Sequence, residues 1–239
     1  MWGVKILTLF PKIFPGPLEE SVIGRGLKKN IWSIEPHNIR DFAIDKHGSV
    51  DDTPCGGGGG MIIRPDVLSS AITESFDFNN PIIYLSPRGK LFNQDIARDL
   101  AKNYQGINLI CGRFEGIDER VIEKFNIEEV SIGDYILSSG DLAAYVMIDA
   151  CVRNIPGILP SQDVLQEESF GDSEAYRYLL EYPQYTKPSV FEGLSVPDVL
   201  LSGNHKKISE WRLKKAREIT KEKRQDLWCK YTKDLKDEN

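Results

Sequence analysis

Short apolar runs alternate with helical segments through the first two-thirds of the chain, and this alternation is what most constrains the fold. Four runs have the length and apolar character of buried strands. The expected strands are Val4–Phe10, Ile82–Leu85, Ile107–Cys111 and Glu129–Ile132. Strands that alternate with helices form parallel sheets, because each crossover connection lays a helix on a face of the sheet. The sequence therefore predicts an α/β fold, a parallel sheet with helices on both faces.

The segments between the runs carry helical signals. An amphipathic helix is expected at Leu18–Lys29 and another at Asp118–Phe125. Asn93 can cap a helix whose apolar stripe is Ile96, Leu100 and Tyr104. Residues 142–152 are apolar almost all round. We therefore expect that helix to be buried on more than one side.

The pattern changes after residue 155. Pro156, Gly157 and Pro160 end the strand–helix alternation, and residues 161–175 are polar and acidic, which favours a linker. Helical spacing then returns in two groups of residues: Ile208, Trp211, Lys215 and Ile219, and Leu227, Trp228, Tyr231 and Leu235. We predict a domain over residues 1–160, a linker over 161–175 and a small helical domain over 176–239.

Charge is divided unevenly between these parts. Residues 204–239 carry 12 Lys and Arg against 7 Asp and Glu, a net charge of +5, whereas the whole chain has a net charge of -6. A basic end on an acidic body is typical of a nucleic-acid contact, although a solvated helix face would carry the same charges.

Several classes of protein are disfavoured. No apolar stretch is long enough to span a membrane, and the N-terminal residues lack the basic region and the cleavage site of a secretory signal. The four cysteines are widely spaced and there are only three His, which argues against a zinc module or a disulfide scaffold. We expect a reduced, cytoplasmic protein.

Five consecutive glycines, Gly56–Gly60, form the most conspicuous local feature. Glycines allow a backbone to approach a phosphate closely, but neither the dinucleotide-binding nor the P-loop spacing is present. The absent dinucleotide spacing also disfavours a Rossmann dehydrogenase. From the residues alone, a flexible loop is favoured over a phosphate cradle.

A stronger signal recurs after three of the expected strands. Ser86–Gly89, Gly112–Arg120 and Gly133–Gly140 each follow a strand and are rich in Gly, Ser or charged residues. Ligands of open α/β sheets bind beyond the carboxyl ends of the strands. Each loop alone could simply end a strand, but the three together favour a ligand pocket.

Three charged residues have both a functional and a structural interpretation. Arg153 follows Asp149 by four residues, which is the spacing of a helical ion pair, but it could also bind an anionic or planar group at a pocket edge. Glu167 and Glu168 lie in the expected linker, where two solvated carboxylates are the simpler interpretation.

These segments together resemble a known family, the bacterial tRNA (guanine-37-N1)-methyltransferases of the TrmD type. The resemblance runs in order along nearly the whole chain, through residues 56–61, 84–87, 111–120, 131–137, 148–157, 182–188 and 199–205. It implies the SPOUT fold, in which a parallel α/β domain contains a deep trefoil knot. It also implies a homodimer in which each active site is shared between subunits, with tRNA gripped by the C-terminal domain.

The resemblance further implies that the knot loops bind the methyl donor S-adenosylmethionine. Matched position by position, the binding residues are Tyr84, Leu85, Ser86, Pro87 and Gly89 on one wall, Gly112 and Glu115 on a second, and Ile132, Gly133, Asp134, Tyr135, Ile136, Leu137 and Gly140 on the third.

The implied reaction methylates guanine N1, which carries a proton at neutral pH. By match, Arg153 stabilises charge at guanine O6. The family's base is an Asp directly before a Ser-Phe pair, and here Glu168 precedes Ser169-Phe170. The family's Gly-Gly-Gly-Pro-Gly is an unbroken glycine run in this chain. Mg²⁺ dependence is a family trait, but the sequence identifies no ligands for it.

Two other functions stay open. A related SPOUT enzyme could methylate a ribose 2′-hydroxyl, which would not need the linker carboxylate. An RNA-binding module without activity would use the basic C-terminal part alone and would not respond to S-adenosylmethionine.

Overall fold

The computed structural model describes the backbone of residues 1–237 and the side chains of residues 1–234. The chain forms two compact units, Met1–Pro160 and Ser161–Asn239. Each is described by itself below.

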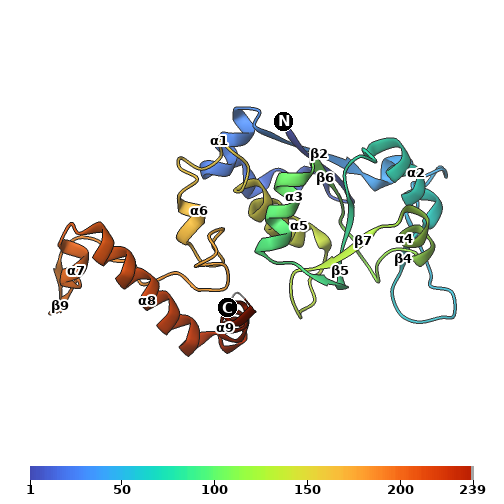
Figure 1. The fold of residues 1–239 in the computed structure, drawn as a ribbon. Coiled ribbons are helices and arrows are strands. Elements are labelled where there is room, and N and C mark those ends of the chain that lie inside the picture. The colour runs from blue at the N-terminus through green and yellow to red at the C-terminus, as the bar shows by residue number, and fades with distance from the viewer. Residues whose placement is uncertain (238–239) are drawn as a thin grey trace. The chain divides into compact units, whose positions relative to one another are not determined.

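The first unit is built on a five-stranded sheet with the order β2-β1-β6-β5-β7, in which every pair is parallel (Figure 1). The strands are β1 (Trp2–Thr8), β2 (Trp32–Asn38), β5 (Ile82–Leu91), β6 (Gly106–Ile110) and β7 (Glu128–Ser131). The four predicted strands are all present. The fifth, β2, was not predicted, because it is half polar and contains Pro36, which an edge strand can accommodate.

Two hydrophobic cores lie on opposite faces of this sheet. Alternate residues of a strand point to opposite faces. Thus Ile83 and Leu85 of β5 join one core, whereas Ile82 and Tyr84 join the other. The first core is covered by α1 (Ser21–Lys28), α3 (Gln94–Asn103) and α5 (Gly140–Val152), the second by α2 (Pro65–Ser75) and α4 (Glu119–Phe125). The predicted parallel sheet with helices on both faces is confirmed.

The predicted helices of this unit are present, with two corrections. Asn93 caps α3 as expected, its side chain accepting a hydrogen bond from the backbone N–H of Ile96 at 3.0 Å. Tyr104, however, lies beyond the end of α3 with extended backbone and is 38% exposed, so it does not belong to the buried stripe. Helix α5 buries one side only, because Leu142 and Val146 are 54% and 51% exposed.

Short elements complete the first unit. Three 3₁₀ turns occur at Pro11–Ile13 (η1), Gly16–Glu19 (η2) and Ile39–Phe42 (η3). Strand β3 (Asp51–Asp52) pairs with β4 (Ile62–Ile63) in an antiparallel ladder, and the long loop between them contains the five glycines.

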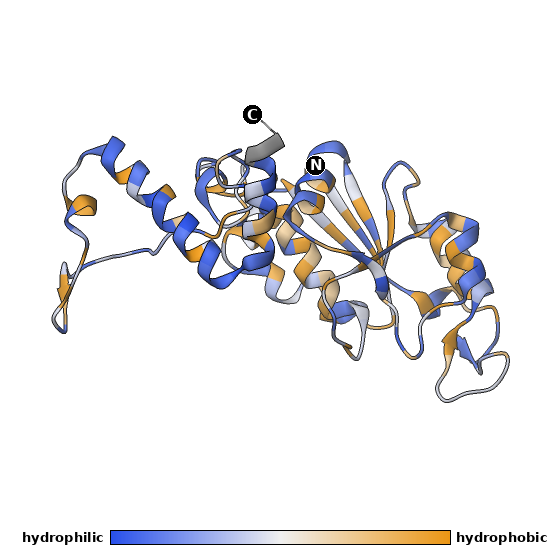
Figure 2. Ribbon diagram, turned by 60° about the horizontal axis from the view of Figure 1, so that its bottom comes forward, coloured by the Kyte–Doolittle hydropathy of each residue, from blue (hydrophilic) through white to orange (hydrophobic). Residues whose placement is uncertain are grey.

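The second unit is mainly helical. It contains α6 (Val164–Glu167), the hairpin of β8 (Val190–Phe191) and β9 (Leu194–Ser195), α7 (Asp198–Leu201), α8 (His205–Lys223) and α9 (Gln225–Asp237). Its small core consists of Tyr176, Leu179, Tyr182, Ala216 and Tyr231. Helix α8 is largely hydrophilic, with few hydrophobic positions along its length (Figure 2). The side chain of Leu235, predicted to continue the apolar pattern, lies outside the described residues.

Residues 161–175, expected to be a linker, are folded within this unit. Leu165 is buried. Its carbonyl accepts a hydrogen bond from the N–H of Asp172 at 2.8 Å. The Ser173 hydroxyl donates to the carbonyl of Gln166 at 2.5 Å. These contacts fold the segment back on α6.

Candidate functional site

A cavity of about 250 Å³ lies at the carboxyl ends of β6 and β7 and beside a bulge inside β5. Its walls are this bulge and the loops that follow β6 and β7, together with the first turn of α5; Ser86–Gly89, expected to be a loop after the strand, belongs to β5. The lining residues are Tyr84–Pro87, Gly112–Gly116, Val130–Gly133, Tyr135–Gly140 and Ala143. The three loops singled out in the sequence therefore converge on one site, as the general position of ligand sites in open α/β sheets predicts.

The first wall is a bulge in strand β5. Leu85 and Lys90 both pair with Val130 of β7, so the residues between them leave the ladder. Ser86 holds the bulge in shape, its hydroxyl accepting a hydrogen bond from the N–H of Arg88 at 3.2 Å. A Cβ on Gly89 would lie 2.3 Å from backbone atoms of Glu129 and Val130, so only glycine allows the bulge to return to β7.

The other two walls are tied to each other. The N–H of Gly140 donates to the carbonyl of Gly112 at 2.9 Å. The Arg113 guanidinium donates to the carbonyl of Ser138 at 3.0 Å. Gly112 also lies against the buried ring of Tyr84, because a Cβ there would come within 2.8 Å of it. The cavity walls therefore form one connected unit.

Most of the predicted donor-binding residues line this cavity. The structure brings together Tyr84, Leu85, Ser86, Pro87, Gly112, Glu115, Ile132, Gly133, Tyr135, Ile136, Leu137 and Gly140. Gly89 and Asp134 do not line it: Gly89 serves the packing of β5 on β7, and Asp134 is exposed. Five further residues of the predicted loops also line the cavity: Arg113, Phe114, Gly116, Ser138 and Ser139.

The polar groups beneath the cavity are kept uncharged or paired. Burial, with a smaller contribution from the negative charge of Glu129, raises the pKa of the Tyr84 hydroxyl, which stays protonated at neutral pH. Asp141, buried in the first turn of α5, accepts a hydrogen bond from the Thr8 hydroxyl at 2.6 Å. Burial, and secondarily Asp141, raises the pKa of the Cys111 thiol well above its usual value. These contacts join α5 to strands β1 and β6 at the cavity floor.

The glycine loop is anchored at the same place. The N–H of Glu115 donates to the carbonyl of Met61 at 2.9 Å, and the N–H of Ile63 donates to the carbonyl of Gly116 at 3.0 Å. A Cβ on Gly60 would come within 2.5 Å of the Glu115 side chain. In contrast, a Cβ on Gly59 would meet no atom of the described residues within 4 Å. One end of the loop is therefore held against Glu115 and Gly116, which line the cavity, whereas its middle is open.

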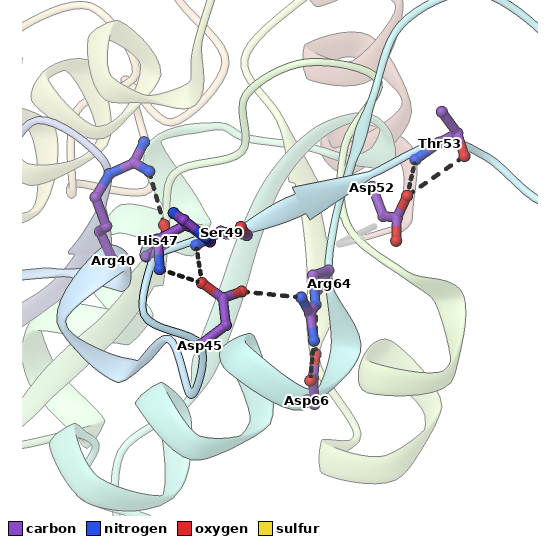
Figure 3. Close-up of polar contacts among 9 residues, drawn as sticks. Arg40, Asp45, His47, Ser49, Asp52, Thr53, Arg64 and Asp66 are labelled. Carbon is purple, nitrogen blue, oxygen red and sulfur yellow. Dashed lines mark hydrogen bonds and ion pairs between the residues drawn. The ribbon is translucent and has the colours of Figure 1, made fainter.

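An ion-pair cluster fixes the base of this loop (Figure 3). Arg64 pairs with Asp66 at 2.6 Å and with Asp45 at 3.4 Å. The hydrogen bond from Arg64 lowers the pKa of the Asp66 carboxyl. The Asp45 carboxylate also accepts hydrogen bonds from the N–H groups of His47 at 2.8 Å and Ser49 at 3.1 Å. This cluster holds the start of α2 against the segment that leads into β3.

Arg153 is not brought to the cavity of its own chain. It caps the C-terminal end of α5, whereas Gly140 at the other end lines the cavity. A helix of 13 residues is about 20 Å long, which exceeds the reach of an arginine side chain. Desolvation raises the pKa of the Asp149 carboxyl, and the charge of Arg153 opposes this shift, so the two side chains interact as their spacing suggested.

The two linker carboxylates have different surroundings. Glu167 ends α6, and its carboxylate accepts a hydrogen bond from the Tyr182 hydroxyl at 3.3 Å and pairs with Arg212 at 3.3 Å. Glu168 has extended backbone, and its carbonyl accepts a hydrogen bond from the N–H of Gly171 at 2.9 Å. The Ser169 hydroxyl accepts from the N–H of Glu181 at 2.9 Å. The segment that carries both carboxylates is therefore held by the core of the second unit.

Two features are absent from the described residues. No group of three or more His, Cys, Asp or Glu in that part of the chain is placed to hold a metal ion. No described helix has the length and apolar character needed to cross a bilayer.

Comparison with known proteins identifies close relatives of this chain. Residues 1–230 match the family described as tRNA (guanine-1)-methyltransferase TrmD. A protein of Bartonella henselae is 52% identical over 96% of this chain and 96% of its own. Proteins of Ruegeria sp. (strain TM1040) and Pelagibacter ubique are 50% and 48% identical, over 97% and 98% of this chain and 93% and 100% of theirs. All three relatives are named tRNA (guanine-N(1)-)-methyltransferase.

Proposed function

The chain belongs to the TrmD family of tRNA (guanine-1)-methyltransferases, and we propose that it methylates N1 of the guanine at position 37, directly 3′ of the anticodon. The observation that carries the proposal is the cavity at the bulge of β5 and the ends of β6 and β7, which gathers the segments that resemble the donor site of the family. Family membership also implies the SPOUT fold with its trefoil knot, which we propose for the first unit.

The cavity has the character that S-adenosylmethionine requires. When bound, this donor supplies an electrophilic methyl group on a positively charged sulfonium. Glu115 is the one carboxylate among the described lining residues, and it can balance that charge. The loops between Gly112 and Gly140 present backbone N–H and C=O groups that can bind the edge of an adenine. Gly112 allows its loop to approach the Tyr84 ring closely, which narrows the cavity.

The acceptor needs a base and a cation. Guanine N1 becomes a nucleophile when its proton is removed, and the negative charge that develops spreads to O6. We propose that the carboxylate of Glu168 accepts the proton and that Arg153 stabilises the charge at O6. We choose Glu168 because it directly precedes Ser169-Phe170, the position of the family's base. Glu167 lies one residue before that position, and its carboxylate binds Arg212 and Tyr182.

The position of Arg153 supports a homodimer with shared sites. Leu142 and Val146 form an exposed apolar strip on α5. If two copies of α5 pair in antiparallel orientation across a two-fold axis, this strip is covered in both. The same pairing brings the C-terminal end of one α5 beside the N-terminal end of the other. Arg153 of one subunit would then lie at its partner's cavity, which it cannot reach in its own chain.

The second unit is proposed to bind the tRNA. The chain from residue 204 onward carries the excess of Lys and Arg, and much of it forms the hydrophilic helix α8. Cationic side chains on such a surface attract the phosphate backbone irrespective of sequence.

Methyl transfer from labelled S-adenosylmethionine tests this function. A tRNA with guanine at position 37 should accept one methyl group, and the same tRNA with adenine there should accept none. Nucleoside analysis of the product should give N1-methylguanosine. A 2′-O-methyl product would instead identify a ribose-specific methyltransferase. Binding of tRNA without methylation would identify an RNA-binding protein without activity.

A further inference from the structure

A second, larger cavity lies wholly within the second unit and shares no lining residue with the donor cavity. It is a groove of about 830 Å³ between residues 182–189 and helices α7 and α8. This volume lies within the range of small-molecule and nucleotide sites. The reaction proposed above gives no role to this groove.

The walls of the groove are rings and aliphatic side chains. Pro183, Tyr185 and Pro188 form one side, and Leu200 and Ile208 belong to the helices opposite. Tyr185 is 47% exposed, and its ring lies 6.2 Å from that of Trp211, which supports it from one side. A ring that is held in place and open on one face can stack on a planar ligand.

The charged groups of the groove are cationic. Lys187 and Arg212 line it, and no Asp or Glu is present among its described lining residues. The Arg212 guanidinium lies 4.8 Å from the centre of the Tyr182 ring and 3.3 Å from the Glu167 carboxylate. Its Nε is buried and has no hydrogen-bond partner among the described residues. The groove therefore offers positive charge.

We propose that this groove binds an unpaired nucleotide of the tRNA, a neighbour of the target guanine in the anticodon loop. Unpaired bases are recognised by stacking on aromatic rings and by hydrogen bonds to their edges, while cations bind the phosphate. Tyr185 supplies the ring, Gln184 and Thr186 supply polar groups for the base edge, and Lys187 supplies the cation.

The contacts of Arg212 place this nucleotide next to the target. Arg212 lines the groove and binds Glu167, which directly precedes the proposed base Glu168. A nucleotide in the groove is thus connected, through Arg212 and Glu167, to Glu168, whose carboxylate is proposed to meet guanine N1. The choice of the anticodon loop rests on the proposed function, whereas the presence of a nucleotide site rests on the groove itself.

Affinity measurements with full-length protein and full-length tRNA test the proposal. Tyr185→Leu keeps an apolar side chain but removes the ring, and should weaken tRNA binding by about 5- to 150-fold, the usual effect of losing one stacked base. Lys187→Gln should weaken binding and lower the salt dependence by about one phosphate contact. Tyr104→Leu and Lys102→Gln, which have the same residue types at the same spacing on the exposed end of α3, should leave binding unchanged.

An abasic scan of the anticodon loop shows whether the groove meets a base. In the wild type, one abasic position other than 37 should weaken binding as much as Tyr185→Leu does. In Tyr185→Leu that abasic position should cause no further loss, because the two changes remove one contact. Normal binding by Tyr185→Leu, or an abasic scan that is the same in both proteins, would overturn the proposal.

Two further measurements remove the remaining ambiguities. The oligomeric state shows whether the groove holds a nucleotide or a second protein chain, and the methylation activity tests the proposed function independently of the groove. Light scattering of Tyr185→Leu should show an unchanged assembly; dissociation into monomers would mean that the groove holds a second copy of the chain and would overturn the proposal. Methylation by the wild type is measured on the same tRNA. If that tRNA is bound but not methylated, the proposed function fails. The abasic scan then still tests whether the groove binds a nucleotide.

Discussion

Gly112→Ala is the sharpest test of the donor cavity, because the structure shows what one added methyl group would meet. A Cβ at this position would lie 2.8 Å from Cε2 and 2.9 Å from the hydroxyl oxygen of Tyr84. Real Cβ atoms essentially never come closer than 3.0 Å to another heavy atom. Tyr84 is buried and belongs to the second core, so its ring has little room to retreat. The loop of Gly112 must therefore move towards the cavity or displace the ring.

Both movements damage the site more than the fold. Overpacking of this kind costs about 1–3 kcal/mol, which lowers the melting temperature by about 2–12 °C for a chain of this size. The carbonyl of Gly112 also accepts the hydrogen bond from Gly140 that joins two cavity walls. A shift of the loop weakens that link, and we expect the affinity for S-adenosylmethionine to fall at least tenfold.

Isothermal titration calorimetry with S-adenosylmethionine measures this loss, and a thermal melt without ligand measures the stability. Gly59→Ala is the matched control, since a Cβ there meets no described atom within 4 Å and the backbone does not require a positive φ. That variant should bind the donor normally and be as stable as the wild type or slightly more so. A folded Gly112→Ala protein that binds the donor with wild-type affinity would show that the cavity is not the donor site.

The base, the shared site, the tRNA contact and the glycine loop each give a further prediction. Glu168→Gln should lower kcat by about 10²–10⁴ with unchanged donor affinity, and Glu168→Asp should keep much of the activity; normal turnover by Glu168→Gln would exclude it as the base. Mixed dimers of Gly112→Ala and Arg153→Ala subunits should recover activity that neither variant has alone, because one intact cavity then meets one intact arginine. A mixed dimer without activity would show that the cavity and Arg153 of the same chain act together. The affinity for tRNA, measured by filter binding, should fall at least tenfold between about 50 and 200 mM salt; an affinity independent of salt would show that the basic helices do not contact phosphates. Gly59→Pro, which restores the proline of the family pattern, should raise the melting temperature, because it restricts the unfolded chain at a position without positive φ; a lower value would show that the loop needs glycine there.

The fold could be predicted where buried apolar residues form a clear pattern in the sequence. Strands β1, β5 and β6 lie inside the sheet and contain apolar runs, and their pattern was sufficient. Strand β7 was also predicted, although it lies at an edge and begins with Glu128 and Glu129; its Val130 and Ser131 are buried. Strand β2 was not predicted, because an edge strand needs only one good neighbour and tolerates Pro36 and polar residues. Helix α2 was also missed: its buried positions include Ala71 and Ser75, which carry a weak signal despite their helical spacing.

The candidate site was predictable to the level of loops but not of single residues. The three loops follow from the ends of the strands. Residue type, however, does not tell Gly89, in the bulge of β5, from Gly112, in the loop after β6. One lets the bulge of β5 return to β7, and the other gives the cavity its close approach to Tyr84. Only the atoms that surround each Cα separate a glycine that builds the sheet from one that shapes the cavity.

The choice between Glu167 and Glu168 has the same origin. The two are adjacent and chemically identical, so no rule of composition or spacing ranks them. The structure separates them because α6 ends between them: Glu167 completes the helix and turns its carboxylate to Tyr182 and Arg212, whereas Glu168 continues in extended backbone. Both partners of Glu167 bind the same oxygen, Oε2. The choice of Glu168 as the base therefore rests on its match to the family position directly before Ser169-Phe170. If Arg212 instead responds to a nucleotide in the neighbouring groove, Glu167 becomes the link by which tRNA binding sets the position of Glu168. Arg212→Gln should then lower kcat with a normal donor affinity and leave Glu168 in place as the base, and a pure rise in KM for tRNA would show that Arg212 only binds.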